Sequence, residues 1–310
     1  MTTKLAPIVI FTYKRLDTLK SSINSLRKCK LSLDSELFIF SDGPKNESDI
    51  FLINDVRDYV KSITGFKSVE LFFSEKNKGL ATSIIGGVSA IFEKHDTVIV
   101  LEDDLVFSPG FLVFMNEALN KYANTQNAFS VSGYSFNLKN KGQTKEDAYF
   151  LSRGWSWGWA TWKDRWLSVD WDVKSYEDFK ANKILQKSFN RGGSDLSSML
   201  QKQMNKKIDS WAIRWFYHQF RVQGLTLYPV YSQVLNIGFD DMATHTTGSA
   251  SRYLPKMDKD LKEEFILPGK VEVNKQFQKY FQRKMGIGSR LKSKIATFLI
   301  YILRYLKLKK

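Results

Sequence analysis

Short apolar runs alternate with helix-like spacing over the first part of the chain. Four runs of apolar, often β-branched residues predict buried strands; they lie at residues 7–12, 37–40, 69–73 and 98–101. Between these runs apolar residues recur every three or four positions, which predicts helices at residues 19–26, 51–63 and 80–92. Strands that alternate with helices are typical of βα units. The pattern therefore predicts an α/β fold with a mostly parallel sheet flanked by helices.

Three consecutive carboxylates, Glu102, Asp103 and Asp104, follow the fourth of these strands. We predict a helix directly after them, with Ser108 as its N-cap and Pro109 in its first turn. The acids then lie at the carboxyl end of a buried strand, where open α/β sheets bind ligands. Adjacent carboxylates repel one another unless a cation neutralises them. A divalent cation that also binds phosphate oxygens, Mn²⁺ or Mg²⁺, is one interpretation, and an acidic surface turn without a ligand is the other.

Other polar side chains follow the predicted strands. Arg15, Asp42 and Asn77 come after the first, second and third strands, as Asp104 does after the fourth. Each residue alone is also consistent with a solvated loop. Because the carboxyl ends of parallel strands meet at one edge of a sheet, four such residues predict a shared binding edge.

Tryptophan is concentrated in one stretch of the second half. Six of the eight tryptophans lie between Trp155 and Trp171, with glycines among them. Large aromatic side chains either fill a core or present flat apolar faces to a ligand such as a sugar ring. We expect Trp162 and Trp166 to lie in the core and other tryptophans to line a binding site.

Two further candidates lie later in the chain. Asp209 precedes an aromatic-rich helix that begins near Trp211, where an acid is either a helix cap or a functional group. His245 lies in a loop after a strand predicted at residues 225–230. A lone histidine in a loop is by default solvated or structural.

Charge and composition narrow the class of partner. The hydrophobic fraction of 43% is ordinary for a globular protein, whereas the net charge of +15 favours an anionic partner. Nucleic acid is not expected as the partner, because the chain lacks zinc-finger, helix-turn-helix and RNP-type signatures. The single Cys29, the absence of a secretory signal and the absence of a run of about 18–20 apolar residues predict a cytoplasmic protein.

The end of the chain differs in kind from the rest. Residues 288–310 contain seven basic residues and no acid, and apolar residues from Leu291 to Leu306 recur on one helical face. This pattern is typical of an interfacial amphipathic helix that binds anionic lipid, with a packing or dimerising helix as the alternative. We therefore predict peripheral association with the inner face of the cytoplasmic membrane.

The order of these motifs resembles that of GT-A glycosyltransferases, in particular the bacterial family-2-like enzymes related to N-acetylglucosaminyltransferase I. The resemblance covers residues 7–247, and its most specific stretch is Leu101–Asp104 with Ser108–Phe111. It implies a Rossmann-like GT-A domain over residues 1–255, followed by an extension at 256–310 that contains the membrane-associating helix. Within that domain it implies a nucleotide-sugar-binding half at 1–107 and an acceptor-binding half at 108–255.

Carried over position by position, the resemblance implies roles for the polar residues at the sheet edge. Asp104 would hold the metal, Asp103 would face the ribose and Glu102 the donor sugar. Arg15 matches the arginine that contacts the nucleotide, and Asp42 matches the aspartate that reads the base.

The same resemblance implies a catalytic base and several binding residues in the second half. Asp209 occupies the place of the base, in Asp-Ser-Trp where the related enzymes have Asp-Asp-Trp. His245 is a second candidate metal ligand. The remaining donor-binding candidates are Thr12, Asn77 and Arg153, and the acceptor-binding candidates are Trp155, Trp157, Trp159 and Trp211.

The expected function is an inverting, metal-dependent glycosyltransferase. It would move a sugar from a nucleoside-diphosphate sugar, with UDP favoured by the resemblance, to a glycan acceptor. A lipid-linked acceptor in bacterial surface polysaccharide biosynthesis (capsule, O-antigen or lipopolysaccharide) would suit the basic tail. Two alternatives stay open: a non-catalytic membrane-associated protein that binds carbohydrate or polyanions, and a sugar nucleotidyltransferase.

Overall fold

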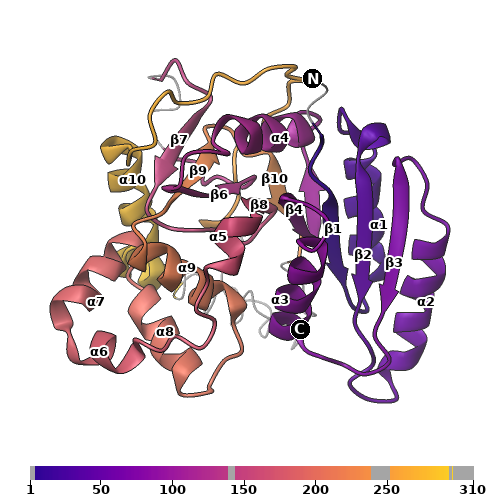
Figure 1. Cartoon of the computed structure of the whole chain (residues 1–310), viewed down its shortest axis with the longest axis horizontal. Helices are drawn as coiled ribbons and strands as arrows, with labels where there is room; N and C mark the ends of the chain where they lie inside the picture. The colour runs from indigo at the N-terminus through magenta and orange to yellow at the C-terminus, as the bar shows by residue number, and fades with distance from the viewer. Residues whose placement is uncertain (1–3, 139–143, 239–251, 293–294, 296–310) are drawn as a thin grey trace, which may run out of the picture.

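The computed structural model describes residues 4–138, 144–238, 252–292 and 295. An eight-stranded sheet with helices on both faces forms its centre (Figure 1). In chain order its strands are β1 (Ile8–Thr12), β2 (Glu36–Ser41), β3 (Ser68–Phe73), β4 (Thr97–Glu102), β6 (Ala128–Ser132), β7 (Ala148–Leu151), β8 (Trp159–Trp162) and β9 (Leu225–Pro229). Their spatial order is β3-β2-β1-β4-β8-β6-β9-β7. The predicted α/β fold, a large sheet flanked by helices, is confirmed.

The direction of the strands differs between the two halves of the sheet. In the first half β1 pairs in parallel with β2 and β4, and β2 pairs in parallel with β3. In the second half β8 runs antiparallel to β4 and β6, and β7 runs antiparallel to β9, whereas β6 and β9 are parallel. The sheet is therefore parallel only in its first half and mixed beyond it. The connecting helices of the first half are α1 (Leu16–Leu26), α2 (Asp49–Lys61) and α3 (Leu80–Ile91).

The core lies on both faces of the sheet. Ile8 and Ile10 of β1 belong to one apolar cluster, with residues of α1, α2 and α4 (Phe111–Lys121). Val9 and Phe11 belong to a second cluster, with residues of α3 and α9 (Trp211–Arg221). Successive strand residues point to opposite faces, so a strand covered on both faces is apolar throughout. This is why β1 reads as a continuous apolar run.

The segment after the three acids departs from the prediction. A short strand, β5 (Leu105–Phe107), pairs with β10 (Val234–Asn236) in a separate two-stranded sheet, and α4 begins only at Phe111. The predicted cap role of Ser108 is wrong, because its hydroxyl is buried and donates to the Asp258 carbonyl at 2.7 Å. A distant segment therefore binds the side chain that the local pattern assigned to the helix.

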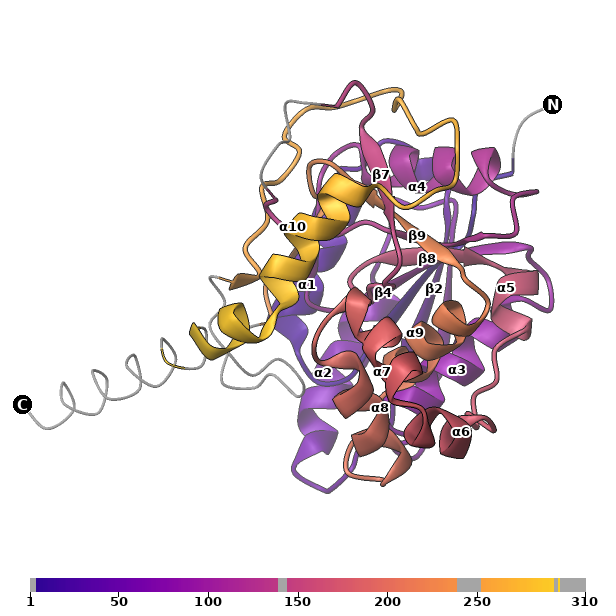
Figure 2. The same ribbon diagram turned by 90° about the vertical axis from the view of Figure 1, so that its left-hand side faces the viewer.

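The remaining helices lie mostly in the second half of the chain. One, η1 (Ser32–Asp34), precedes β2, and the others are α5 (Lys163–Leu167), α6 (Tyr176–Ala181), α7 (Lys183–Phe189), η2 (Asn190–Gly192), α8 (Leu196–Met204) and α10 (Lys275–Met285). In Figure 2, α10 lies across the edge of the sheet that β7 forms. Phe277 of α10 stacks on Tyr149 of β7 with ring centroids 3.9 Å apart. Residues of this late segment therefore share one core with the strands.

The predicted amphipathic helix at 288–310 lies mostly outside the described residues. Residues 288–292 and 295 are described, and there Leu291 and Ile295 are exposed. Within the described ranges, no helix combines the length and the apolar character needed to cross a bilayer.

Candidate functional site

The three acids lie at the carboxyl edge of the parallel half of the sheet. β4 ends at Glu102, which is paired with Phe11 of β1, so the residues just after both strands are neighbours. Asp103 Oδ2 accepts hydrogen bonds from the Thr12 hydroxyl at 2.9 Å and from the Tyr13 amide at 3.3 Å. The end of β1 thereby fixes the orientation of the Asp103 carboxylate.

Arg15 joins the two aspartates. Its Nη2 lies 2.7 Å from Asp103 Oδ1 and 2.8 Å from Asp104 Oδ2. The side chains are 18%, 6% and 9% exposed, in the order Arg15, Asp103, Asp104. The predicted proximity of Arg15 and Asp104 is therefore confirmed, and Thr12 belongs to the same cluster.

A segment from the far end of the chain closes over this cluster. The Ile237 amide donates to the Asp104 carbonyl at 2.8 Å, and Asn236 Nδ2 donates to Asp104 Oδ1 at 3.4 Å. A Cβ on Gly238 would overlap the Asp104 carboxylate and lie 2.9 Å from Arg15 Nη1. Only glycine allows this approach. The sequence does not reveal the role of Asn236 and Gly238, because nothing near them in the sequence signals the contact.

Burial and mutual repulsion set the charge state of the acids. Burial, with the negative charges of Asp104 and Asp103, raises the pKa of Glu102 to about 8. Burial also raises the pKa of Asp104, although Arg15 opposes the shift. One guanidinium thus faces a larger number of acids, and its charge balances only part of theirs.

A divalent cation fits the donor chemistry of this cluster. Asp103 and Asp104 offer carboxylate oxygens, which Mn²⁺ and Mg²⁺ prefer, and substrate phosphates and water commonly complete the coordination of such ions. Among the described residues no set of three His, Cys, Asp or Glu side chains is arranged to hold a metal ion. His245, the other predicted ligand, lies outside the described residues.

Asp42 and Asn77 hold two loops together at the same edge. Asp42 Oδ1 accepts from the amides of Gly43 and Lys78, each at 2.9 Å, and Oδ2 accepts from the Gly79 amide at 3.1 Å. Asn77 Nδ2 donates to the Gly43 carbonyl at 3.0 Å. These bonds join the loop after β2 to the loop that begins α3. The contacts of Asp42 in this structure are thus with backbone amides.

Asp209 reaches this edge from the second half of the chain. Ser210, not Asp209, caps α9, because its Oγ accepts from the Ile213 amide. The Asp209 side chain is 63% exposed, with Oδ1 3.7 Å from Arg214 Nη2. Its Oδ2 lies 3.7 Å from the position that a Cβ on Gly79 would take. The carboxylate therefore lies beside the loop that Asp42 organises and is accessible.

Arg153, a predicted donor-binding residue, is paired with an acid inside the protein. Its Nη1 and Nη2 form a bidentate pair with Asp195, at 2.8 and 3.0 Å, and its side chain is 5% exposed. The charge of Arg153 is thus already neutralised inside the protein. Asp195 lies 42 residues from Arg153 in the sequence, and the local sequence pattern does not predict the pair.

More of the tryptophans lie in the core than we expected. Trp162 and Trp166 are buried, as predicted, but so are Trp159, Trp211 and, less completely, Trp155. Trp159 stacks on Trp211 with ring centroids 5.0 Å apart. The prediction that Trp159 and Trp211 form ligand walls is therefore corrected, since both rings face other aromatic side chains in the core. Trp157 is only partly buried, and its ring lies edge-on to Trp155 at 5.4 Å.

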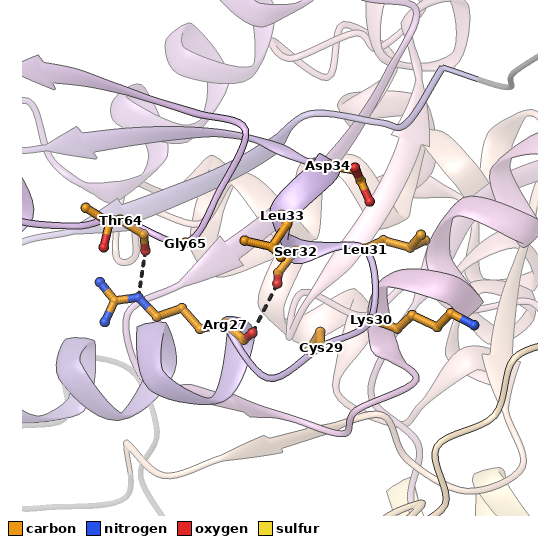
Figure 3. A pocket seen from close by; sticks show the side chains of 9 residues that line it. All are labelled: Arg27, Cys29, Lys30, Leu31, Ser32, Leu33, Asp34, Thr64 and Gly65. Atoms are coloured by element: carbon orange, nitrogen blue, oxygen red, sulfur yellow. Dashed lines mark hydrogen bonds between the residues drawn. The ribbon is translucent and has the colours of Figure 1, made fainter.

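A surface pocket of about 460 Å³ lies elsewhere, at the far end of α1 (Figure 3). Arg27 and Thr64 line it, with the Arg27 Nε donating to the Thr64 carbonyl at 2.8 Å. Its lining residues include those just before β2 and β3, so it sits at the amino edge of the parallel strands. Open α/β sheets bind ligands at the opposite, carboxyl edge. The acid cluster is therefore the better candidate site.

Comparison with solved structures gives several similar chains. GalNAc-T7, solved with UDP, GalNAc and Mn²⁺, aligns with a TM-score of 0.48 and 12% identity over 76% of this chain and 44% of its own. The mannosyltransferase PcManGT from Pyrobaculum calidifontis, solved with GDP-Man and Mn²⁺, aligns with a TM-score of 0.34 and 11% identity over 44% of this chain and 38% of its own. TarS 1–349 of S. aureus aligns with a TM-score of 0.34 and 11% identity over 51% of this chain and 47% of its own. This chain thus spans less than half the length of each of these structures.

Comparison of the sequence with curated proteins and with models of protein families identifies the family of this chain. No curated protein matches it. The family model for glycosyl transferase family 2 matches residues 8–189, a segment that runs from β1 through α7 and includes the three acids. More than half of the chain is covered by this match. The protein belongs to glycosyl transferase family 2.

Proposed function

We propose that this protein is a metal-dependent, inverting glycosyltransferase that uses a nucleoside-diphosphate sugar, with UDP the favoured nucleotide. The observation that carries the proposal is the buried cluster of Arg15, Asp103 and Asp104 at the carboxyl edge of the sheet, in a chain of glycosyl transferase family 2. Such an edge is where open α/β sheets bind nucleotides. The cluster combines acids for a cation with a guanidinium for a phosphate.

The proposed metal ligand is Asp104, with Asp103 beside it. Their surplus of negative charge supports Mn²⁺ or Mg²⁺ as the cofactor. When bound, such a cation stabilises negative charge on a leaving diphosphate. The role of the protein's own side chains is to hold these carboxylates in place. The Thr12 hydroxyl donates a hydrogen bond to Asp103, and the Asn236 side-chain amide donates one to Asp104.

The proposed donor contacts follow from the same edge. Arg15 offers its guanidinium to the diphosphate, and Glu102, the last residue of β4, is the proposed contact of the donor sugar. Asp42 is proposed to read the base, and Asn77 supports it by holding the loop after β2.

Asp209 is the proposed catalytic base. Its accessible carboxylate would accept the proton of an acceptor hydroxyl as that oxygen bonds to the anomeric carbon of the donor sugar. The bond from that carbon to the diphosphate oxygen breaks in the same displacement, so the configuration inverts. Trp155 and Trp157 are the proposed acceptor contacts, with Trp157 the more accessible because it is only partly buried.

The proposed acceptor is a glycan linked to a lipid, in the synthesis of a bacterial surface polysaccharide. The net charge of +15 and the exposed Leu291 beside Arg290 and Lys292 support association with an anionic membrane surface. Deletion of residues 288–310 is expected to release the protein from vesicles that contain anionic lipid. Sedimentation with such vesicles tests this, and retention of the truncated protein would place the anchor elsewhere.

Donor binding tests the central proposal. Thermal melting of the purified protein is measured with UDP-, GDP-, dTDP- and CMP-sugars, with and without Mn²⁺. We expect stabilisation by one nucleotide class that needs Mn²⁺ and is lost in Asp104→Ala, but retained in the matched control Asp58→Ala on the exposed side of α2. No response to any donor in a protein that melts cooperatively would favour a non-catalytic carbohydrate- or polyanion-binding protein.

Turnover tests the proposed base. Asp209→Asn is expected to reduce sugar transfer strongly and to leave donor binding nearly unchanged, because the proposed role of Asp209 is to accept the acceptor's proton and not to hold the donor. Equal losses of binding and turnover would contradict the role.

A further inference from the structure

We propose that Arg15 occupies the cation position of the ligand-free protein, so that a divalent cation and a diphosphate bind strongly only together. This inference rests on the proposed function, since it concerns the same acid cluster. It concerns what Arg15 does before any ligand arrives, whereas the proposed donor contact concerns the loaded site.

The first step is a count of the oxygens that a cation could use. Asp103 Oδ2 already accepts from Thr12 and from the Tyr13 amide. Asp104 Oδ1 accepts from Asn236 Nδ2, at 3.4 Å. The remaining oxygens of the two aspartates, Asp103 Oδ1 and Asp104 Oδ2, are the two that Arg15 Nη2 holds at 2.7 and 2.8 Å. A cation therefore meets Arg15 at the oxygens best placed to receive it.

The second step concerns space. Gly238 closes over the Asp104 carboxylate and Arg15 so tightly that a Cβ could not be added. One side of the guanidinium is thus covered by the backbone after β10. A cation cannot enter on the Gly238 side of the Asp104 carboxylate without movement of this contact, and at Asp103 Oδ1 and Asp104 Oδ2 it must displace Arg15.

The third step concerns charge. The side chain of Arg15 is only 18% exposed, so that without its carboxylates its charge is poorly compensated, and a neighbouring divalent cation would also repel it. A diphosphate supplies the missing partner, because guanidinium groups bind phosphate oxygens with charge-assisted hydrogen bonds. Arg15 can then leave the aspartates for the phosphates. Each ligand consequently strengthens the binding of the other.

Such coupling is reciprocal. If the diphosphate raises the affinity for the cation by a given factor, the cation raises the affinity for the diphosphate by the same factor. Couplings of about 5–150-fold are typical, and we expect at least about tenfold here. Removal of the Arg15 charge should weaken the coupling and strengthen the binding of the cation alone.

The test measures Mn²⁺ binding by electron paramagnetic resonance and UDP binding by calorimetry with and without Mn²⁺, on the full chain. The variant is Arg15→Gln, and the matched control is Arg27→Gln, which removes the same charge at the opposite edge of the sheet (Figure 3). Arg15→Gln is expected to bind Mn²⁺ alone about tenfold more tightly than the wild type. Its Mn²⁺–UDP coupling should fall toward one, whereas Arg27→Gln should behave as the wild type.

The outcomes separate this inference from the proposed function. If Arg15→Gln binds Mn²⁺ alone no more tightly than the wild type, the inference is wrong, even where Mn²⁺ and UDP bind together and the proposed function stands. If Arg15→Gln gains Mn²⁺ affinity but no nucleoside diphosphate binds any form, Arg15 does occupy the cation position, whereas the coupling to a diphosphate and the proposed function both fail. Should Arg15→Gln not fold, Arg15→Met, which also removes the charge, is measured instead, and an Mn²⁺ affinity equal to that of the wild type would overturn the inference.

Discussion

The buried pair of Arg153 and Asp195 offers a direct test of the packing. Asp195 accepts a bidentate contact from Arg153, and both side chains lie almost wholly inside the protein. Asp195→Ala removes the partner and leaves a buried guanidinium uncompensated. Breaking a buried pair in this way costs about 3–5 kcal/mol. No side-chain cap of α8 is lost with Asp195, so the cost comes from the ion pair.

The expected change in melting temperature follows from the size of the protein. Unfolding entropy of about 2.1 cal/mol/K per residue over 310 residues gives about 0.65 kcal/mol/K. A loss of about 3–5 kcal/mol therefore lowers the melting temperature by about 5–8 °C. Differential scanning calorimetry measures it.

Two controls accompany this measurement. Asp58→Ala removes an acid from the exposed pair with Lys61, which should leave the melting temperature nearly unchanged. Arg153→Met combined with Asp195→Leu removes both charges and should recover much of the loss. If the melting temperature of Asp195→Ala equals that of Asp58→Ala, the reasoning about buried charge is refuted.

The same pair predicts a dependence on pH. Burial opposes ionisation of Asp195, but the Arg153 guanidinium outweighs it and holds the pKa of Asp195 below its ordinary value. A carboxylate with a lowered pKa in the folded state stabilises the protein above its unfolded pKa, about 3.9, and this stabilisation is lost as the pH falls through the folded pKa. The difference between wild type and Asp195→Ala should hold from pH 7 to pH 5 and shrink below about pH 4.

Three further variants test other contacts. Gly238→Ala is expected to abolish Mn²⁺-dependent donor binding in thermal melting, because its Cβ would overlap the Asp104 carboxylate; unchanged binding would mean that this segment is not so close. Trp159→Ala should destabilise the protein by about 3–5 kcal/mol, since the ring is buried in an aromatic cluster, and a surface-like change in melting temperature would contradict its place in the core. Ser108→Ala should cost about 1–3 kcal/mol in calorimetry, because the Asp258 carbonyl loses its buried donor; a neutral effect would contradict a stabilising buried hydrogen bond at this position.

The fold of the first half was predictable because each element is encoded locally. β1 and β4 are continuous apolar runs, since both faces of those strands are covered. Once these strands are parallel, their carboxyl ends must meet, which brings Arg15 to Asp103 and Asp104. The main part of the candidate site follows from strand order and direction alone.

Other features depend on contacts between distant segments. The local pattern predicted that Ser108 caps a helix, and the family resemblance implied that Trp159 lines the acceptor site. In the structure each side chain instead contacts a residue from a distant segment. A serine caps a helix, or an aromatic ring faces solvent, only when no more favourable contact with a distant segment is available. Which distant segments are available is known only once the chain is folded.

The sequence by itself determined the four strands of the first half, the helices between them and the edge at which the acids lie. Only the tertiary structure decided that Asn236 and Gly238 close over those acids and that Arg153 is neutralised by Asp195. The physical reason is range. Hydrophobic periodicity reports the surroundings of a residue within a few turns, whereas packing and ion pairing depend on which remote segments the fold brings within a few ångströms.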